Sequence, residues 1–429
     1  MKAPFLILLV GCLGWNCAAA DAPRFLTLRQ AQELALKQHP SISVAALSAL
    51  AAQQATKEVR SALLPNVFAS ATAVGTADPN NTRIGAGGLN NPLIYEREAD
   101  GATISQLITD FGRSSELTRS AKLRERSEQM NVQATRAQIL LEVNNAYFST
   151  LESQSVMEVA QQTLAARALV LEQTQALATN KLKSELDVSF VRVDYDQANI
   201  LLAKARNDLQ ASFATLSDVL GEPRPLAFTL SDEPMPAYVT NNYSTFIFEA
   251  LQQRPDLAQL RYQRDAAREF AKAEGKLGYP TIDALGTAGV IPTGNSHLAS
   301  DYAAAGINLT LPLYTGGLDT ARRREAEFKS SAAEETLRGE EDNIARDVQI
   351  TCLNLDYAHQ RLALTEQLLA NANEAMELAK ARFQIGSTSI IELSQAELNQ
   401  TSAQIDAATA RYDYQIQYSA LDFQIGRLR

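Results

Sequence analysis

The feature that most constrains this chain is a stretch of over a hundred residues, from Arg113 to Leu220, that contains neither glycine nor proline. These two residue types interrupt helices most strongly, so the stretch predicts helix of unusual length. A polar segment at 179–184 would divide it into two antiparallel helices, at about 113–178 and 185–220. The first would be roughly 100 Å long at 1.5 Å per residue, which is longer than an ordinary compact domain needs.

The second half of the chain repeats the pattern of the first. Apolar residues recur at every seventh position in both halves, and an offset of 205 relates the two sets: Met157, Leu164, Leu171 and Ala178 to Leu362, Leu369, Met376 and Phe383. The same offset relates Gly112 to Gly317, and an offset of 215 relates Pro40 to Pro255. The sequence therefore predicts a tandem duplication, with about ten extra residues in the first copy between Pro65 and Gly112. We expect repeats at 21–225 and 226–429, with the second pair of long helices at 318–384 and 390–425.

The apolar residues of the long helix in the second repeat face small ones. Large side chains fill one heptad position, and smaller residues follow three positions later: Ala358, Thr365, Ala372 and Ala379. Large residues opposite small ones let long helices pack closely side by side, as in coiled coils. We interpret this stripe as packing and not as a chemical site.

Each repeat also contains two stretches that alternate with the two-residue period of a β-strand. They lie at about 66–75 and 101–109 in the first repeat and at about 281–290 and 302–313 in the second. A first helical segment precedes each pair, at 28–63 with a break near His39-Pro40 and at 246–277 with a break near Pro255. Each repeat is thus expected to run helix, β-hairpin, long helix and returning helix.

The strands fit either a half-buried soluble sheet or a membrane-spanning barrel. Beyond the N-terminus the sequence has no apolar run long enough for a membrane helix. Aromatic residues also lie near the expected strand ends, as in the girdles of membrane barrels: Tyr95, Phe111, Tyr279, Tyr302 and Tyr314. Four strands cannot close a barrel, and open edges are not tolerated in hydrocarbon, so several chains would have to pool their strands. The strand pattern alone leaves two or three copies open.

The N-terminus predicts export from the cytoplasm. Lys2 precedes an apolar run, and Ala18-Ala19-Ala20 precedes Asp21, as at the cleavage site of a secretory signal peptide at 1–20. An alternative is a lipoprotein signal ending before Cys12, which would make Cys12 a lipid anchor. Cleavage after residue 20 would leave Cys352 as the single cysteine, so no disulfide could form within a monomer, and we expect Cys352 to be a buried apolar residue.

Composition argues against several functional classes. The formal net charge is −10 with acidic and basic residues interspersed, so nothing indicates a nucleic-acid partner. The three histidines are far apart, and no glycine-rich phosphate loop is present. The sequence therefore predicts no enzyme, cofactor or metal centre.

The duplicated pattern resembles the TolC-like family of outer-membrane efflux channels over essentially the whole mature chain. The resemblance rests on Leu311-Pro312-Leu313-Tyr314-Thr315-Gly316-Gly317, similar to the family's strand-to-helix signature, and on residues 383–392, similar to its tip motif. The first repeat carries poorer versions, at 107–112 and at Ser184-Glu185-Leu186-Asp187, with Lys181 where a glycine is expected.

The resemblance implies a mainly helical fold with membrane strands. Three copies would form a homotrimer with a twelve-stranded β-barrel in the outer membrane, continuous with a helical tunnel in the periplasm. Expected partners are a periplasmic adaptor protein, an inner-membrane pump or transporter, and outer-membrane lipids. The implied function is a passive exit channel for small molecules; the alternatives are a channel for type I protein secretion and a periplasmic coiled-coil scaffold without a pore.

The resemblance also implies site residues at the two helical tips. Asp187 and Glu392 match carboxylates that narrow the tunnel in the family, and Gln395 stands where a second acidic residue is expected. Thr388 replaces an arginine that some members use to hold the tip closed, and Phe383 replaces a tyrosine. Alternatively, each carboxylate is a solvent-exposed residue in the first turn of a helix, where the helix dipole favours a negative charge. Candidates for adaptor contact are five residues: Lys181, Lys183, Gly386, Ser387 and Thr388.

Overall fold

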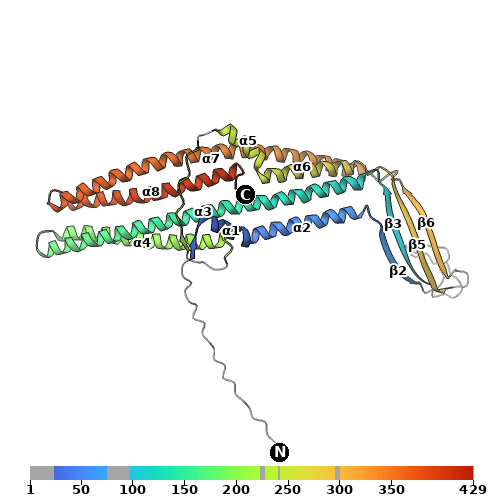
Figure 1. Cartoon of the computed structure of the whole chain (residues 1–429), viewed down its shortest axis with the longest axis horizontal. Helices are drawn as coiled ribbons and strands as arrows, with labels where there is room; N and C mark the ends of the chain where they lie inside the picture. The colour runs from blue at the N-terminus through green and yellow to red at the C-terminus, as the bar shows by residue number, and fades with distance from the viewer. Residues whose placement is uncertain (1–23, 75–96, 223–227, 240–241, 295–299, 429) are drawn as a thin grey trace, which may run out of the picture. The chain divides into compact units, whose positions relative to one another are not determined.

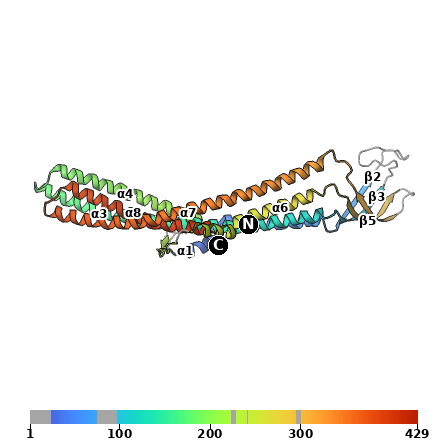
Figure 2. The same cartoon turned by 90° about the horizontal axis from the view of Figure 1, so that it is seen from above.

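The structure is a computed structural model that describes residues 24–74, 97–222, 228–239, 242–294 and 300–428. The expected signal peptide, Cys12, Tyr95 and Pro223–Pro225 lie outside the described residues. Figures 1 and 2 show the chain in two views related by 90°. No described helix is both long enough and apolar enough to cross a bilayer.

The two repeats have matching elements (Figure 1). The first contains β1 Arg24–Leu26, α1 Leu28–Gln38, α2 Pro40–Ser61, β2 Asn66–Val74, β3 Arg97–Thr109, α3 Arg113–Thr179 and α4 Glu185–Val219. The second contains β4 Phe228–Leu230, α5 Tyr243–Gln253, α6 Pro255–Glu274, β5 Thr281–Gly294, β6 Asp301–Thr310, α7 Leu318–Gln384 and α8 Ile390–Gln424. The long helices have equal lengths in both repeats, 67 residues for α3 and α7 and 35 for α4 and α8.

The backbone turns also repeat with the offset of 205. Residues with positive φ occur in four equivalent pairs: Phe111 and Gly316, Gly112 and Gly317, Lys181 and Gly386, Gly221 and Gly426. The φ angles agree closely, for example 76° at Gly221 and 79° at Gly426, where each glycine ends a returning helix. Lys181 adopts 61° where the second repeat has glycine, so its side chain tolerates a left-handed conformation that favours Gly.

Some element boundaries differ from the sequence-based expectation. The last strand was expected at 302–313, but β6 ends at Thr310. Pro312 has no N–H to donate to a strand ladder, which explains the earlier end. The short parallel pair formed by β1 and β4 was not predicted, because three residues are too few to show a period. The Tyr147 hydroxyl lies 3.0 Å from the Leu26 carbonyl oxygen and 2.6 Å from that of Ser231, beside this pair.

The chain forms two compact units, and each draws on both repeats. One unit contains residues up to 39, 142–238 and 358–416; the other contains 40–141, 239–357 and 417–429. The first includes the β1–β4 pair, α4, most of α8, and the parts of α3 and α7 from residues 142 and 358 onward. The second includes the four-stranded sheet with α2, α5, α6 and the first parts of α3 and α7. The duplication is therefore a property of the sequence order, whereas each compact unit combines equivalent segments of both copies.

The second unit contains an antiparallel sheet in the order β2-β3-β5-β6 (Figure 1). The strand register places small and apolar side chains on one face: Val67, Ala69, Ala102, Ile104, Ile282, Ala284, Gly286, Ala288, Ala303, Ala305, Ile307 and Leu309. The other face is mostly polar and includes Ser70, Thr72, Thr103, Ser105, Asp283, Thr287, Asn308 and Thr310. Large apolar residues on the first face are exposed in the single chain, including Ile307 at 75%. This division matches strands with one face toward lipid and one toward water.

Two glycines in the middle of the sheet make room for an aromatic ring. A Cβ added to Gly289 would collide with the Tyr302 ring and with the Asp100 carbonyl oxygen, and a Cβ on Gly101 would collide with the Tyr302 hydroxyl. We predict that Gly289→Ala destabilises the folded sheet by about 1–3 kcal/mol, because the ring and the backbone must move apart. Gly306→Ala is the matched control, since nothing lies within 4 Å of its added Cβ. The check is urea unfolding of the membrane-inserted protein; equal stability of the two variants would contradict the prediction.

Candidate functional site

The heptad stripe forms the packing between the helical hairpins of the first unit. Val191, Ala379, Ile390 and Leu393 form a buried cluster, with Leu171, Met376 and Phe383 packed against it. A second cluster contains Ala160, Leu202 and Ala205, with Met157 and Leu164 against it. The interpretation of the stripe as packing is therefore confirmed. Cys352, in the other unit, is also buried as expected, and burial raises the pKa of its thiol to about 11.

The turn between α3 and α4 contacts the end of α7. The Lys183 ammonium lies 5.0 Å from the centroid of the Phe383 ring, a cation–π geometry. Of the candidates for adaptor contact, Lys183 is therefore partly engaged within the chain. The apolar residues beside the two turns are open to solvent, with Leu182 at 70% and Ile385 at 80% exposure.

Asp187 lies in the first turn of α4 and forms a capping box with Ser184. The Ser184 N–H donates to Asp187 Oδ2 at 3.0 Å, and the Asp187 N–H donates to Ser184 Oγ at 3.2 Å. The backbone and side-chain hydrogen bonds from Ser184 lower the pKa of Asp187. These contacts explain an acid at this position through helix capping. The constriction role of Asp187 stays a prediction.

Glu392 has the equivalent place in α8. It accepts a hydrogen bond from the Thr388 hydroxyl and pairs with Arg382 at 3.2 Å. Gln395 donates to Asn399 Oδ1 at 2.9 Å. The structure thus brings Thr388 and Glu392 together within the second tip. Gly386 forms the turn with a φ of 73°, followed by Ser387.

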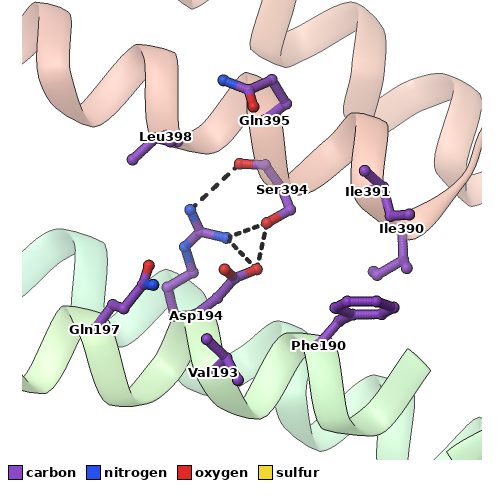
Figure 3. A pocket seen from close by; sticks show the side chains of 10 residues that line it. Phe190, Val193, Asp194, Gln197, Ile390, Ile391, Ser394, Gln395 and Leu398 are labelled. Atoms are coloured by element: carbon purple, nitrogen blue, oxygen red, sulfur yellow. Dashed lines mark hydrogen bonds and ion pairs between the residues drawn. The ribbon is translucent and has the colours of Figure 1, made fainter. Parts of the chain in front are cut away.

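A buried charge cluster near the tips was not predicted from the sequence. Arg167 of α3 lies 3.1 Å from Asp194 Oδ2 of α4 and 2.5 Å from Glu397 Oε2 of α8. The guanidinium also donates to Ser394, at 3.3 Å to its Oγ and 3.4 Å to its carbonyl oxygen, and the Ser394 hydroxyl donates to Asp194 (Figure 3). One cation therefore joins three helices from both repeats.

Two carboxyl groups share one guanidinium in this cluster. The side chains of Arg167 and Glu397 are each only 8% exposed. Burial raises the pKa of Glu397, and the nearby Asp194 charge raises it further, while Arg167 and Lys380 lower it. Burial is the largest of these effects, so the ionised form of Glu397 is disfavoured in the folded chain.

The raised pKa of Glu397 predicts that the tip becomes less stable as the pH rises. The folded chain holds the Glu397 proton more tightly than the unfolded chain, whose glutamate pKa is near 4.5. Stability from this group is therefore fully present below about pH 4.5 and is lost as the pH rises through the folded pKa. Glu397→Gln should remove this dependence and be tolerated at pH 7. Hydrogen exchange of α8 at several pH values checks this; an unchanged pH dependence in the variant would contradict it.

A cavity of about 330 Å³ adjoins the cluster between α4 and α8 (Figure 3). Arg167, Asp194, Gln197, Ser394 and Gln395 form its polar lining. The apolar lining consists of Phe190, Val193, Ile390, Ile391 and Leu398. The candidate constriction residue Gln395 and the charge cluster therefore border the same cavity.

The sequence contains a signal for the buried position of Arg167. Arg167 lies three residues after Leu164, in the same heptad position as Ala160 and Thr174, and all three side chains are buried. The offset of 205 relates Arg167 to Ala372. A charged residue in a packing position that is alanine in the other repeat indicates a buried ion pair, although its partners on α4 and α8 could not be read from the spacing.

The comparisons with known proteins agree with this architecture. The family model described as "Outer membrane efflux protein" matches residues 31–222 and 246–427, one match for each repeat. The chain is 28% identical over 390 residues to the outer membrane protein TolC of Vibrio cholerae, covering 88% of this chain and 85% of that protein. It is 22% identical to the alkaline protease secretion protein AprF of Pseudomonas aeruginosa, covering 94% and 85%. The crystal structure of a membrane protein from Pseudomonas aeruginosa shares the fold, with a TM-score of 0.82, 22% identity and 93% of each chain covered.

Long paired helices joined to a sheet with one apolar face define a channel-type membrane protein. The chain belongs to the outer membrane efflux protein family, because that family's model matches most of both repeats. It is accordingly an outer-membrane efflux channel protein, and the predicted fold class, mainly helical with membrane strands in two tandem repeats, is confirmed.

Proposed function

We propose that three copies of this chain form a passive exit channel that crosses the outer membrane and extends into the periplasm. The sheet carries the proposal. Its apolar face fits lipid, and its outer strands β2 and β6 have no second partner strand within the sheet. Open strand edges are not tolerated in hydrocarbon, so the edges of different copies must pair. Three copies with four strands each give a closed barrel of twelve strands, large enough to hold water.

The channel would serve a tripartite efflux system for small molecules. A periplasmic adaptor would contact the tips at Lys181, Lys183, Gly386, Ser387 and Thr388, and an inner-membrane pump would supply the energy. Passage through a water-filled channel requires no catalytic residue, cofactor or metal. The repeats at 21–225 and 226–429 would each supply one hairpin of the barrel and one pair of tunnel helices.

Asp187, Glu392 and Gln395 would line the narrow end of this channel. Threefold symmetry turns each carboxylate into a ring of charge, which attracts cations and repels anions. If Asp187 acts only as a helix cap, Asp187→Asn and Ser184→Ala should destabilise the first turn of α4 to a similar extent and leave ion selectivity unchanged. If it lines the constriction, Asp187→Asn lowers cation selectivity in a planar bilayer and Ser184→Ala does not.

Fractionation of a diderm bacterium that expresses the full chain tests the proposed assembly. We expect an outer-membrane species larger than one chain that collapses to the monomer on boiling. A periplasmic monomer released without detergent would instead support the scaffold without a pore.

Type I protein secretion is the second candidate function. It is favoured by the similarity to the alkaline protease secretion protein, which extends over 94% of this chain. Complementation of a strain lacking its efflux channel and of a strain lacking its secretion channel distinguishes the two functions.

A further inference from the structure

The cavity between α4 and α8 has a polar side and an apolar side. Its lining residues come from three helices, α3, α4 and α8, of one chain. In Figure 3, Phe190, Ile390 and Ile391 lie together on one side of Asp194 and Ser394. The volume of about 330 Å³ is at the lower end of the range for small-ligand sites, about 300–1,000 Å³. The size and the mixed lining therefore fit a small molecule with one polar end.

The polar side offers a carboxylate oxygen to a ligand. Both hydrogen bonds that Asp194 accepts within the described residues end at Oδ2, one from Arg167 at 3.1 Å and one from the Ser394 hydroxyl. Asp194 Oδ1 has no donor among these residues, and the Asp194 side chain lines the cavity. Gln197 and Gln395 add amide groups to the same lining. A ligand that donates hydrogen bonds therefore finds acceptors on this side.

The charges around Asp194 favour a cationic ligand. Among the described residues, Asp194 pairs with one cation, Arg167, which also lies 2.5 Å from Glu397 Oε2. A neutral ligand would remove water from a carboxylate that shares its cation with a second carboxyl group, and such burial costs free energy. An ammonium group would instead supply a second positive charge and a charge-assisted hydrogen bond.

The apolar side is open in the single chain. Phe190 is 46% exposed, Ile391 61% and Leu398 54%. An apolar ligand body that covers these side chains removes apolar surface from water, which favours binding. An inorganic cation would use only the polar side of the cavity, whereas an organic cation uses both sides.

We propose that the cavity between α4 and α8 binds a small organic ammonium ion, whose charged group contacts Asp194 and whose apolar body covers Phe190 and Ile391. The site lies apart from the candidate carboxylates Asp187 and Glu392, neither of which lines the cavity. Because the ligand would contact both α4 and α8, its binding should stabilise the packing of these two helices.

Three probes of similar size separate the effect of charge from that of apolar contact. They are phenylbutylammonium, the neutral phenylbutanol and the anionic phenylbutyrate, each titrated calorimetrically into the detergent-purified full-length protein and into detergent alone. We expect the ammonium probe to bind about tenfold more tightly than the alcohol or better, since hydrogen bonds to charged groups are stronger than neutral ones. Phenylbutyrate should bind more weakly than the alcohol.

Hydrogen exchange gives a local readout that partition into detergent cannot produce. The ammonium probe should slow amide exchange at 190–197 in α4 and at 391–398 in α8, while the sheet keeps its exchange rates. Phenylbutanol at the same concentration should produce a smaller effect.

Gln197→Arg tests the charge without removing a member of an ion pair. Gln197 is exposed and lines the cavity, so the new cation should weaken ammonium binding about tenfold and strengthen phenylbutyrate binding. Gln210→Arg is the matched control, because Gln210 is an exposed glutamine of the same helix outside the cavity lining. It should leave the affinity of both probes unchanged.

Equal affinity for the ammonium and the alcohol probes would overturn the site for a cation, as would equal effects of Gln197→Arg and Gln210→Arg. Absence of binding by every probe would overturn the ligand site altogether. Neither result touches the proposed channel, whose conductance is recorded without any probe.

Discussion

Replacement of Arg167 by methionine is expected to loosen α8 from α3 and α4 by about 3–5 kcal/mol, the usual effect of removing one partner from a buried ion pair. Methionine nearly fills the volume but leaves Asp194 and Glu397 close together without the cation that joins them. Hydrogen exchange should therefore speed up near Ser394 and Glu397 while the sheet stays protected. In a planar bilayer, we expect a larger conductance because the tip opens more readily.

A variant that removes the charges together separates this effect from a packing defect. Arg167→Met combined with Asp194→Asn and Glu397→Gln leaves no unpaired charge in the cluster. It should recover most of the lost protection, since replacing a whole buried ion cluster costs far less than breaking it. If the triple variant is as unstable as Arg167→Met alone, the loss comes from packing and the electrostatic account is wrong.

Ile307→Arg is expected to impair insertion or stability of the membrane sheet by about 2–4 kcal/mol, the effect of an arginine on the lipid face near the middle of a membrane strand. Ile307 lies on the apolar face of β6 and is 75% exposed in the single chain. The next residue, Asn308, lies on the polar face, so Asn308→Arg is the matched control.

The two variants differ only in the face that receives the charge. Asn308→Arg should fold and shift ion selectivity toward anions, because a positive charge would then line the water-filled interior. Ile307→Arg should lower the heat-resistant oligomer in the outer membrane. Equal yields would show that the apolar face does not contact lipid.

Most of the fold could be predicted from the sequence because its strongest signals, the heptads and the repeat offset, extend over long stretches of the chain. The helices α3 and α4 follow from the absence of glycine and proline, and α7 and α8 follow from the repeated heptads and the offset of 205, although α7 contains Gly339. Glycine marks the turns at 112, 221, 317, 386 and 426, and each of these glycines adopts the positive φ that glycine allows. Short elements such as β1 and β4 carry too few residues for a period. The end of β6 depended on Pro312, whose missing N–H outweighs the alternation that continues to Leu313.

The site was harder to predict than the fold. Asp187 and Glu392 were predicted as constriction residues from the resemblance to the TolC-like family. In the structure, their local contacts are helix capping for Asp187 and pairing with Arg382 for Glu392. The Arg167 cluster joins residues separated by 27 and 227 positions, so it depends on which helix faces meet. That information comes from packing in three dimensions and has no fixed sequence spacing.

Single-channel recording of the purified oligomer in a planar lipid bilayer tests the central claim most directly. Passive channels formed by pooled strands should give discrete, ohmic conductance steps that need no energy source, with larger steps for Arg167→Met than for the wild type. A detergent-purified oligomer that inserts into the bilayer and gives no conductance, in either the wild type or the variant, would contradict the channel.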